Sequence, residues 1–238
     1  MENIARMIQA VMDLDGDFHI LIVDDNSPDG TAEIVEKLIP DYMGRLFILN
    51  RPGKQGLGTA YIAGFKWALD KGYEYIFEMD ADFSHDPNDL IRLYESCKED
   101  GADVAIGSRY VKGGSVKNWP ANRIFISYSA SIYTRMITWM PVKDCTAGFI
   151  CYTRKVLEHI ALDEVKFIGY AFQIEMKYRA WKKGFQLKEV PITFVDRKEG
   201  LSKMSKGIIK EAVFGVWKMR TFNQNGKTVV AASNKNEQ

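Results

Sequence analysis

Short apolar runs alternate with amphipathic segments over the first hundred residues, and this alternation constrains the fold most. The runs that predict strands are His19–Val23, Leu46–Leu49, Tyr75–Met79 and Val104–Ile106. The segments that predict helices are Glu2–Met12, Gly58–Asp70 and Asn88–Lys98. Strands that alternate with helices through short loops are typical of a doubly wound α/β domain with a mainly parallel sheet.

The pattern changes after Ser108. Apolar residues repeat between 120 and 140, and a basic, apolar-striped segment covers 205–222, so both regions predict amphipathic helices. Between them we expect strands over Ala147–Tyr152 and Gln186–Val190 and a helix over Tyr170–Lys182. The length of 238 residues suits one domain, which we place at 1–222, followed by a disordered tail at 223–238.

The composition excludes several classes of protein. A hydrophobic content of 46% with 26% charged residues is ordinary for a globular chain and excludes disorder throughout. Three cysteines without a Cys-x-x-Cys pair argue against a disulfide scaffold or a structural zinc site, and favour a reducing, cytoplasmic location. No uncharged run exceeds the eleven residues of Ile124–Thr134, and the first residues lack signal-peptide features, so we expect neither a membrane span nor a leader.

Charge divides the chain into two unlike halves. Residues 1–103 hold 9 Lys and Arg against 21 Asp and Glu, whereas residues 104–238 hold 23 against 10. The acidic half is suited to a cation and the basic half to phosphate or an anionic surface. The alternative is solvated surface charge that happens to segregate.

The sharpest local motif is Asp80-Ala-Asp82, at the end of a predicted strand. Two carboxylates at such a position suit Mg²⁺ or Mn²⁺, which also take phosphate oxygens from a substrate. His85 is a further candidate ligand, although a solvent-exposed turn histidine is the simpler interpretation. The alternative for the pair is an acidic turn that caps the next helix.

Three further segments carry features suited to phosphate. The loop 51–58, Arg-Pro-Gly-Lys-Gln-Gly-Leu-Gly, matches neither a dinucleotide fingerprint nor a P-loop, and its glycines serve either phosphate binding or helix packing. Arg109 follows a predicted strand, and the segment 196–203 contains Arg197 and Lys203. Arginine forks hold phosphates well, but each of these residues alone is also suited to a surface salt bridge.

Taken together, these motifs resemble a known family. They are Val23-Asp-Asp-Asn-Ser-Pro-Asp-Gly-Thr31, Lys54-Gln-Gly-Leu-Gly-Thr-Ala60, Met79-Asp-Ala-Asp-Phe-Ser-His85 and Gly107-Ser-Arg-Tyr110. In order and spacing they resemble the family-2 glycosyltransferases, and more narrowly the polyprenol (dolichyl) phosphate mannose synthases. The resemblance extends over roughly residues 2–220 through Asp144-Cys-Thr-Ala-Gly-Phe149, Phe172-Gln-Ile-Glu175 and Arg197 to Lys203.

The resemblance implies a GT-A fold and an inverting glycosyltransferase. It implies GDP-mannose as donor, Mg²⁺ or Mn²⁺ as cofactor and a polyprenyl phosphate lipid as acceptor. Because the acceptor's tail stays in the bilayer, it also implies peripheral attachment to the cytoplasmic face of the membrane. An acceptor phosphate is already anionic, so no catalytic histidine is needed.

The resemblance also assigns roles residue by residue. The implied catalytic residues are Asp82, Arg109 and Arg197. The implied contacts to the nucleotide sugar are Val23, Asp25, Lys54, Asp80, Ala81, Asp82, Arg109, Arg197 and Lys203. The implied metal ligands are Asp80, Asp82 and Ser84, and the implied contacts to the acceptor phosphate are Arg123 and Ser127.

One feature departs from the family pattern. The family begins with a strand that ends in a base-binding turn, whereas this chain begins at Met1-Glu2-Asn3-Ile4, which resembles the tail of that motif. We therefore expect the first family strand to be missing, through a misassigned start or a truncation. Its absence would expose the apolar edge of an internal strand and weaken nucleotide binding.

Other functions compete with this interpretation. A sibling transferase using a UDP-sugar, such as a glucosyltransferase, would share the motifs. A phospho-receiver-like binding module would share the Asp24-Asp25 pair, but it is about half as long and has no use for Asp-x-Asp. Nucleic-acid binding would use the basic half, but no aromatic-basic motif supports it, so we expect no nucleic acid.

Overall fold

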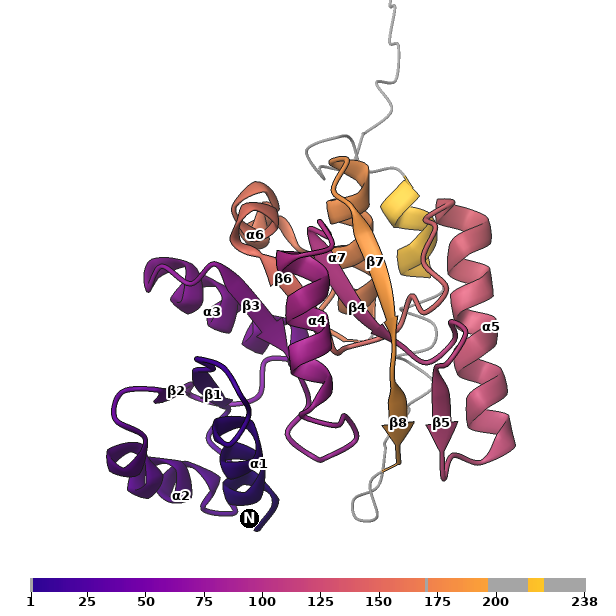
Figure 1. Cartoon of the computed structure of the whole chain (residues 1–238). Coiled ribbons are helices and arrows are strands. Elements are labelled where there is room, and N and C mark those ends of the chain that lie inside the picture. The colour runs from indigo at the N-terminus through magenta and orange to yellow at the C-terminus, as the bar shows by residue number, and fades with distance from the viewer. Residues whose placement is uncertain (1, 170, 197–213, 221–238) are drawn as a thin grey trace, which may run out of the picture.

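The computed structural model describes residues 2–169, 171–196 and 214–220 (Figure 1). The helices are α1 (Glu2–Met12), α2 (Thr31–Leu38), α3 (Leu57–Asp70), α4 (Asp89–Lys98), α5 (Ala121–Thr138), α6 (Arg154–His159) and α7 (Ala171–Lys182), with 3₁₀ turns η1 (Ile39–Tyr42) and η2 (Leu162–Glu164). The strands are β1 (Ile20–Asp24), β2 (Leu46–Asn50), β3 (Tyr75–Glu78), β4 (Val104–Ser108), β5 (Ser115–Lys117), β6 (Ile150–Thr153), β7 (Leu187–Pro191) and β8 (Thr193–Val195).

The predicted elements up to residue 196 are present, with ends that differ by a few residues. Of the helix predicted over 205–222, the described part is helical at 214–220. The predicted tail at 223–238 lies outside the described residues.

The central sheet is mixed, with strand order β3-β6-β4-β7. β4 pairs with β7 in parallel, whereas β6 lies between β3 and β4 and is antiparallel to both. β1 pairs with β2, and β5 with β8, each in parallel. Among the described residues, three of the five strand pairs are parallel, in line with the prediction of a mainly parallel sheet. The antiparallel strand β6 follows α5 in the chain.

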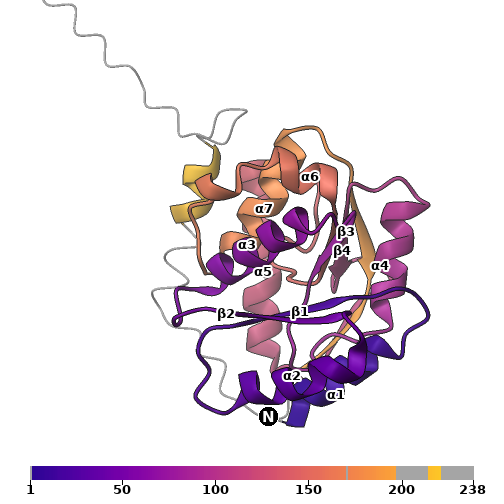
Figure 2. The same ribbon diagram turned by 90° about the vertical axis from the view of Figure 1, so that its left-hand side faces the viewer.

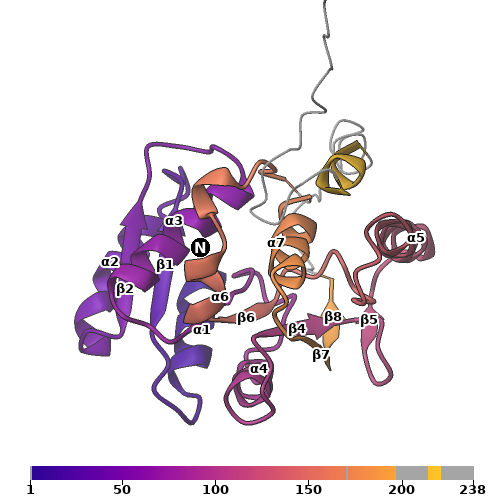
Figure 3. The same ribbon diagram turned by 90° about the horizontal axis from the view of Figure 1, so that it is seen from above.

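Helices cover both faces of the central sheet (Figures 2 and 3). On one face, Met7 and Val11 of α1 and Leu93 of α4 pack with Ala105 and Cys151. On the other face, α3, α6 and α7 pack against neighbouring residues of the same strands. Adjacent residues of a strand point to opposite faces, so β4 and β6 contribute to both cores.

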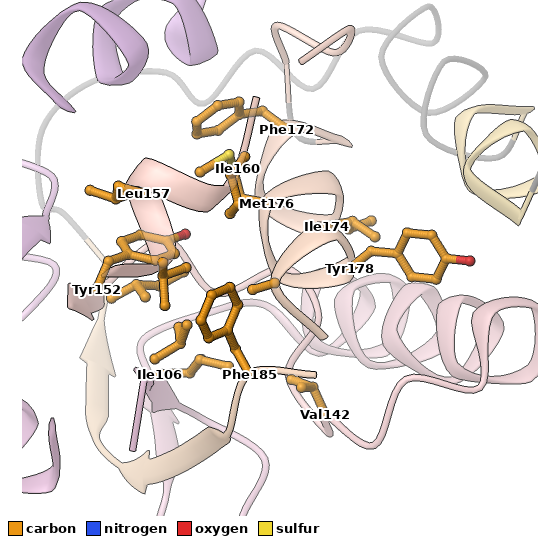
Figure 4. Close-up of a cluster of buried hydrophobic side chains, with 14 of the residues drawn as sticks. Ile106, Val142, Tyr152, Leu157, Ile160, Phe172, Ile174, Met176, Tyr178 and Phe185 are labelled. Atoms are coloured by element: carbon orange, nitrogen blue, oxygen red, sulfur yellow. The ribbon is translucent and has the colours of Figure 1, made fainter. Parts of the chain in front are cut away.

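The larger core lies under α6 and α7 (Figure 4). Tyr152, Phe172 and Met176 are fully buried there, together with Ile106 and Leu157. Burial at about 25 cal/mol per Å² of apolar surface makes this cluster the main source of stability for the α7 side of the sheet.

The sheet is interrupted between β1 and β3. Within the described residues, β1 pairs with β2 alone and β3 pairs with β6 alone. A cavity of about 480 Å³ lies between the two strands. Of the flanking strands, β1 is half-buried except for Asp24, and β3 buries Ile76 and Glu78. The missing first strand stays a prediction.

No helix in the described ranges is long and apolar enough to cross a bilayer. α5 and the residue that follows it nevertheless leave large apolar side chains exposed, among them Phe125, Met136 and Trp139.

Candidate active site

The carboxyl ends of β1 and β3 bring the two acidic motifs to one place. Asp24 ends β1, and Asp80 follows β3 by two residues. Val23, Asp24, Ser27, Asp80 and Ala81 all line the cavity between the strands. Residues of two distant motifs therefore meet at one cavity, at the sheet edge where α/β proteins bind ligands.

The turn of Asp80-Ala-Asp82 is held in a specific shape. The Tyr61 hydroxyl donates a hydrogen bond to Asp80 Oδ1 at 3.2 Å. Asp82 Oδ1 accepts one from the Ser84 backbone N–H at 3.0 Å. Phe83 has a φ of 59°, a left-handed conformation that is uncommon for an aromatic residue. Such backbone strain is concentrated at functional sites, where the surrounding structure maintains it.

The three predicted metal ligands differ in their exposure to solvent. Asp80 is exposed and Asp82 is half-buried, whereas Ser84 is buried and its carbonyl accepts a hydrogen bond from Val195 N–H at 3.0 Å. The described part of the chain contains no cluster of three or more His, Cys, Asp or Glu side chains that could hold a metal. Two carboxylates fit Mg²⁺ or Mn²⁺, which take their remaining ligands from water and substrate phosphate. The ligand roles of Asp80, Asp82 and Ser84 stay predictions.

His85 is buried rather than exposed to solvent. Its ring packs on Phe149 and Phe194, with centroids 4.8 and 5.1 Å away. Burial, followed by the charge of Arg109, lowers the pKa of His85 to about 4. The imidazole is therefore neutral at pH 7 and lies between the Asp82 turn and Arg109.

Asp25, the predicted contact to the nucleotide base, forms a salt bridge with Arg51. Arg51 Nε lies 2.6 Å from Asp25 Oδ1, and Arg51 Nη2 also donates to Thr59 at 3.0 Å. Lys54 is exposed in the loop that follows β2. In this loop, Gly58 has a packing role: a Cβ there would lie 2.7 Å from the Phe172 ring.

Arg109 is buried against Asp144. Its Nε donates to Asp144 Oδ2 at 2.7 Å and its Nη2 to Oδ1 at 2.6 Å. Nη2 also donates to Thr146 Oγ1 at 2.8 Å. The forked geometry fixes the guanidinium in one orientation. Asp144 lies in the Asp-Cys-Thr-Ala-Gly-Phe stretch, but sequence reasoning assigned it no partner.

The two predicted acceptor contacts lie next to Arg109. Ser127 Oγ is 3.5 Å from Thr146 Oγ1, which binds Arg109. Arg123 stacks 4.1 Å above the Trp119 ring and pairs with Asp196 at 2.9 Å. Arg109 lies 5.4 Å from the same ring. The structure thus gathers Arg109, Arg123 and Ser127, whereas Arg197 and Lys203 lie outside the described residues.

Two buried ionisable residues near the turn, Glu78 and Lys177, were not predicted. Glu78 accepts a hydrogen bond from the Tyr152 hydroxyl at 3.3 Å, and Lys177 Nζ donates to the Ala147 carbonyl at 2.7 Å. Burial raises the pKa of Glu78 to about 8 and lowers the pKa of Lys177 to about 8. The charge of Lys177 partly offsets the effect of burial on the pKa of Glu78, and the charge of Glu78 does the same for the pKa of Lys177. The available signal was Glu78, a charged residue inside the apolar run Tyr75–Met79.

Comparison with known proteins assigns the family. The family model described as glycosyl transferase family 2 matches residues 1–161. The chain belongs to glycosyl transferase family 2. It is therefore a glycosyltransferase, as the resemblance implied. The Asp80–Asp82 turn and the arginine cluster, formed by Arg109 and Arg123 around Trp119, are the candidate active site of this family-2 enzyme.

Two curated relatives of this family-2 glycosyltransferase are similar over most of its length. The polyprenol monophosphomannose synthase of Mycolicibacterium smegmatis is 46% identical over 221 residues, covering 92% of this chain and 83% of that protein. The undecaprenyl-phosphate mannosyltransferase of Micrococcus luteus is 44% identical over 214 residues, covering 90% and 85%.

Solved structures confirm the GT-A-type fold. Glucosyl-3-phosphoglycerate synthase from Mycobacterium tuberculosis, solved with Mn²⁺, UDP-glucose and phosphoglyceric acid, has a TM-score of 0.62 at 14% identity and covers 92% of this chain and 74% of that one. S. aureus TarS, solved with UDP, has a TM-score of 0.60 at 16% identity and covers 94% and 63%. At these identities the likeness concerns the fold alone.

Proposed function

We propose that this glycosyltransferase moves mannose from GDP-mannose to a polyprenyl phosphate at a membrane surface. The observation that carries the proposal is the 46% identity, over 92% of the chain, to a polyprenol monophosphomannose synthase. The Asp80–Asp82 turn and the arginine cluster support it. The two substrates carry three phosphates between them, and a cation on the carboxylates and the arginine side chains are suited to bind these phosphates.

The donor end of the site is assigned to the carboxyl ends of β1 and β3. Val23 and Asp25 face the base, Lys54 and Ala81 the rest of the nucleotide, and Asp80 and Asp82 hold Mg²⁺ or Mn²⁺. When bound, the cation neutralises charge that develops on the departing diphosphate. Tyr61 positions Asp80 for this role through its hydrogen bond.

The acceptor end is assigned to Arg109, Arg123 and Ser127. Asp144 and Asp196 orient the two guanidinium groups, so their positive charge is fixed before substrate arrives. The acceptor phosphate is a ready nucleophile at neutral pH and requires no strong general base. Its direct attack on the anomeric carbon inverts the configuration and expels the nucleoside diphosphate. Arg197 and Lys203 remain predicted phosphate contacts.

The helix 214–220 lies beside α5 (Figures 1 and 3), and both segments carry exposed apolar side chains suited to a membrane surface. Phe125 of α5 and Trp139, the residue that follows α5, are each 72% exposed, and Phe214 in the helix 214–220 is 73% exposed. Arg220 lies 5.5 Å above the Trp139 ring and joins the two helices. Apolar side chains with neighbouring basic residues are the features of helices that lie among lipid headgroups.

A donor and acceptor screen tests the proposal. The full chain is incubated with Mg²⁺ or Mn²⁺ and either GDP-mannose or UDP-glucose, with undecaprenyl phosphate as acceptor and undecaprenol as matched control. We expect mannosyl transfer to the phosphate, none to the alcohol and little from UDP-glucose. Efficient transfer from UDP-glucose with none from GDP-mannose would contradict the donor assignment, and transfer to the alcohol would contradict the acceptor assignment.

A further inference from the structure

The Arg123 guanidinium, assigned above to the acceptor phosphate, already binds an anion in this structure. Its Nη1 lies 2.9 Å from Asp196 Oδ1. We propose that Asp196 is an internal competitor of the acceptor phosphate: its carboxylate occupies the place of the phosphate on Arg123 and leaves when the phosphate binds. The inference rests on the proposed function, and it adds a residue that sets how tightly the acceptor end holds its substrate.

A carboxylate and a phosphate present similar groups to an arginine. Each offers negatively charged oxygens that accept hydrogen bonds from the guanidinium fork, so arginine binds both kinds of anion in the same way. Asp196 Oδ1 accepts such a bond from Arg123 Nη1. Two anions at one guanidinium repel each other, so the phosphate binds best when the carboxylate has moved away.

The two aspartates at the acceptor end are held with different firmness. Asp144 accepts a forked pair of hydrogen bonds from Arg109, and these side chains are 0% and 8% exposed. The side chains of Arg123 and Asp196 are 25% and 23% exposed. Opening a partly exposed ion pair costs much less free energy than opening a buried one. Asp196 is therefore the aspartate that leaves, whereas Asp144 stays on Arg109.

The Asp196 carboxylate can leave while the main chain before it keeps its place. The Asp196 N–H donates to the Lys117 carbonyl at 3.0 Å. The preceding residues Thr193–Val195 form β8, which pairs with β5, and Val195 N–H donates to the Ser84 carbonyl at 3.0 Å. A rotation about χ1 of Asp196 is then enough to turn the partly exposed carboxylate toward solvent.

Arg123 keeps its position when the carboxylate leaves, because an aromatic ring holds it. Its guanidinium carbon lies 4.1 Å from the centre of the Trp119 ring, and that of Arg109 lies 5.4 Å from the same centre. Trp119 in turn packs edge-on against Phe194, with 5.1 Å between the ring centroids. A guanidinium that stacks on a ring keeps the N–H groups in its own plane available to an anion. The donors released by Asp196 therefore remain in place for the phosphate.

The competition lowers the affinity of the acceptor end for every phosphate, the product included. The acceptor is a phosphate monoester with about 1.5–2 negative charges at pH 7, whereas the product is a diester with a single negative charge. Asp196 therefore recovers Arg123 more easily from the product than from the acceptor, which favours product release.

Binding of farnesyl phosphate to the full chain tests the proposal. Calorimetry measures its dissociation constant with and without GDP and Mg²⁺. We expect Asp196→Asn, which removes the charge but keeps the shape of the side chain, to lower this constant about threefold to fivefold, the range for a partly exposed ion pair. Asp163→Asn is the matched control, because Asp163 pairs with Lys66 of α3 at the surface, and it should leave the constant unchanged.

An Arg123→Gln background separates competition from a general effect of charge. In that background Asp196→Asn should change the dissociation constant by less than about twofold, because the two residues act through one contact. Tightening of the same size in both backgrounds, equal tightening by Asp163→Asn, or no tightening by Asp196→Asn alone would overturn the competition. A parent chain that binds no farnesyl phosphate in either condition, or an Arg123→Gln variant that binds it as tightly as the parent, would instead refute the acceptor assignment of the proposed function, and the inference with it.

Discussion

Arg109 and Asp144 form a forked ion pair in which both side chains are buried, with N–O distances of 2.6 and 2.7 Å. Thirty-five residues separate them in the chain. The carboxylate also accepts the backbone N–H of Arg109 at 3.0 Å, so one side chain fixes both the strand end and the guanidinium. The pKa of Asp144 is lowered despite its burial, because the charge of Arg109 and its hydrogen bonds outweigh desolvation.

Asp144→Ala should destabilise the fold strongly. The substitution leaves Arg109 buried without its counter-ion, which costs about 3–5 kcal/mol of unfolding free energy. Asp100→Ala is the matched control, because Asp100 pairs with Lys188 at the surface and should lose about 1 kcal/mol or less. Urea titrations measure both, and equal losses would contradict the structural importance of the buried pair.

Asp82→Asn should abolish most of the sugar transfer without unfolding the chain. The amide keeps the acceptor for Ser84 N–H but removes the charge that holds the cation. We expect turnover to fall about 100-fold or more, as several kcal/mol of charge stabilisation are lost. Asp86→Asn, in the same loop, keeps its acceptor for Asn88 N–H and should retain activity. Metal-dependent activity in the Asp82 variant at the parent level would contradict the site.

Glu78 should make stability depend on pH. Its pKa rises from 4.5 to about 8 on folding, so the native state keeps a proton that the unfolded state releases. The contribution is full below pH 4.5 and is lost as pH rises toward 8. Glu78→Gln removes this titration. The loss of unfolding free energy as pH rises should therefore be smaller by at least about 1.4 kcal/mol, the equivalent of one pKa unit. Thermal unfolding across this range checks it, with the exposed Glu74→Gln as control; identical profiles for parent and Glu78→Gln would contradict the assignment.

The α5 face should bind anionic vesicles. Met136→Ser removes an apolar side chain that is 70% exposed on this face. The matched control is Met43→Ser, which removes a side chain that is 90% exposed on the turn before β2, outside α5. We expect the first to lower cosedimentation with phosphatidylglycerol vesicles about threefold, since burying a side chain of this size contributes on the order of 1 kcal/mol. The second should have no effect. Binding should weaken with added salt, and equal behaviour of the two variants would remove the membrane role of α5.

The elements with a local signal were predictable. In α1, Ile4, Met7, Ile8 and Val11 repeat at helical spacing, and all four are buried in the structure. The pair Asp80 and Asp82 could also be placed from the sequence, because two carboxylates after an apolar strand lie at the edge where ligands bind. Helical periodicity and strand ends depend on neighbours within a few residues, which a sequence displays directly.

The tertiary structure alone decided the long-range pairings. The resemblance implied a base contact at Asp25 and a phosphate contact at Arg109. It did not give their partners Arg51 and Asp144, nor the antiparallel insertion of β6. It suggested a missing strand, but only the fold showed a cavity lined by β1 and β3. Burial and packing over the whole chain decide which distant charges meet and which strand edges stay unpaired. A local sequence pattern does not contain this information.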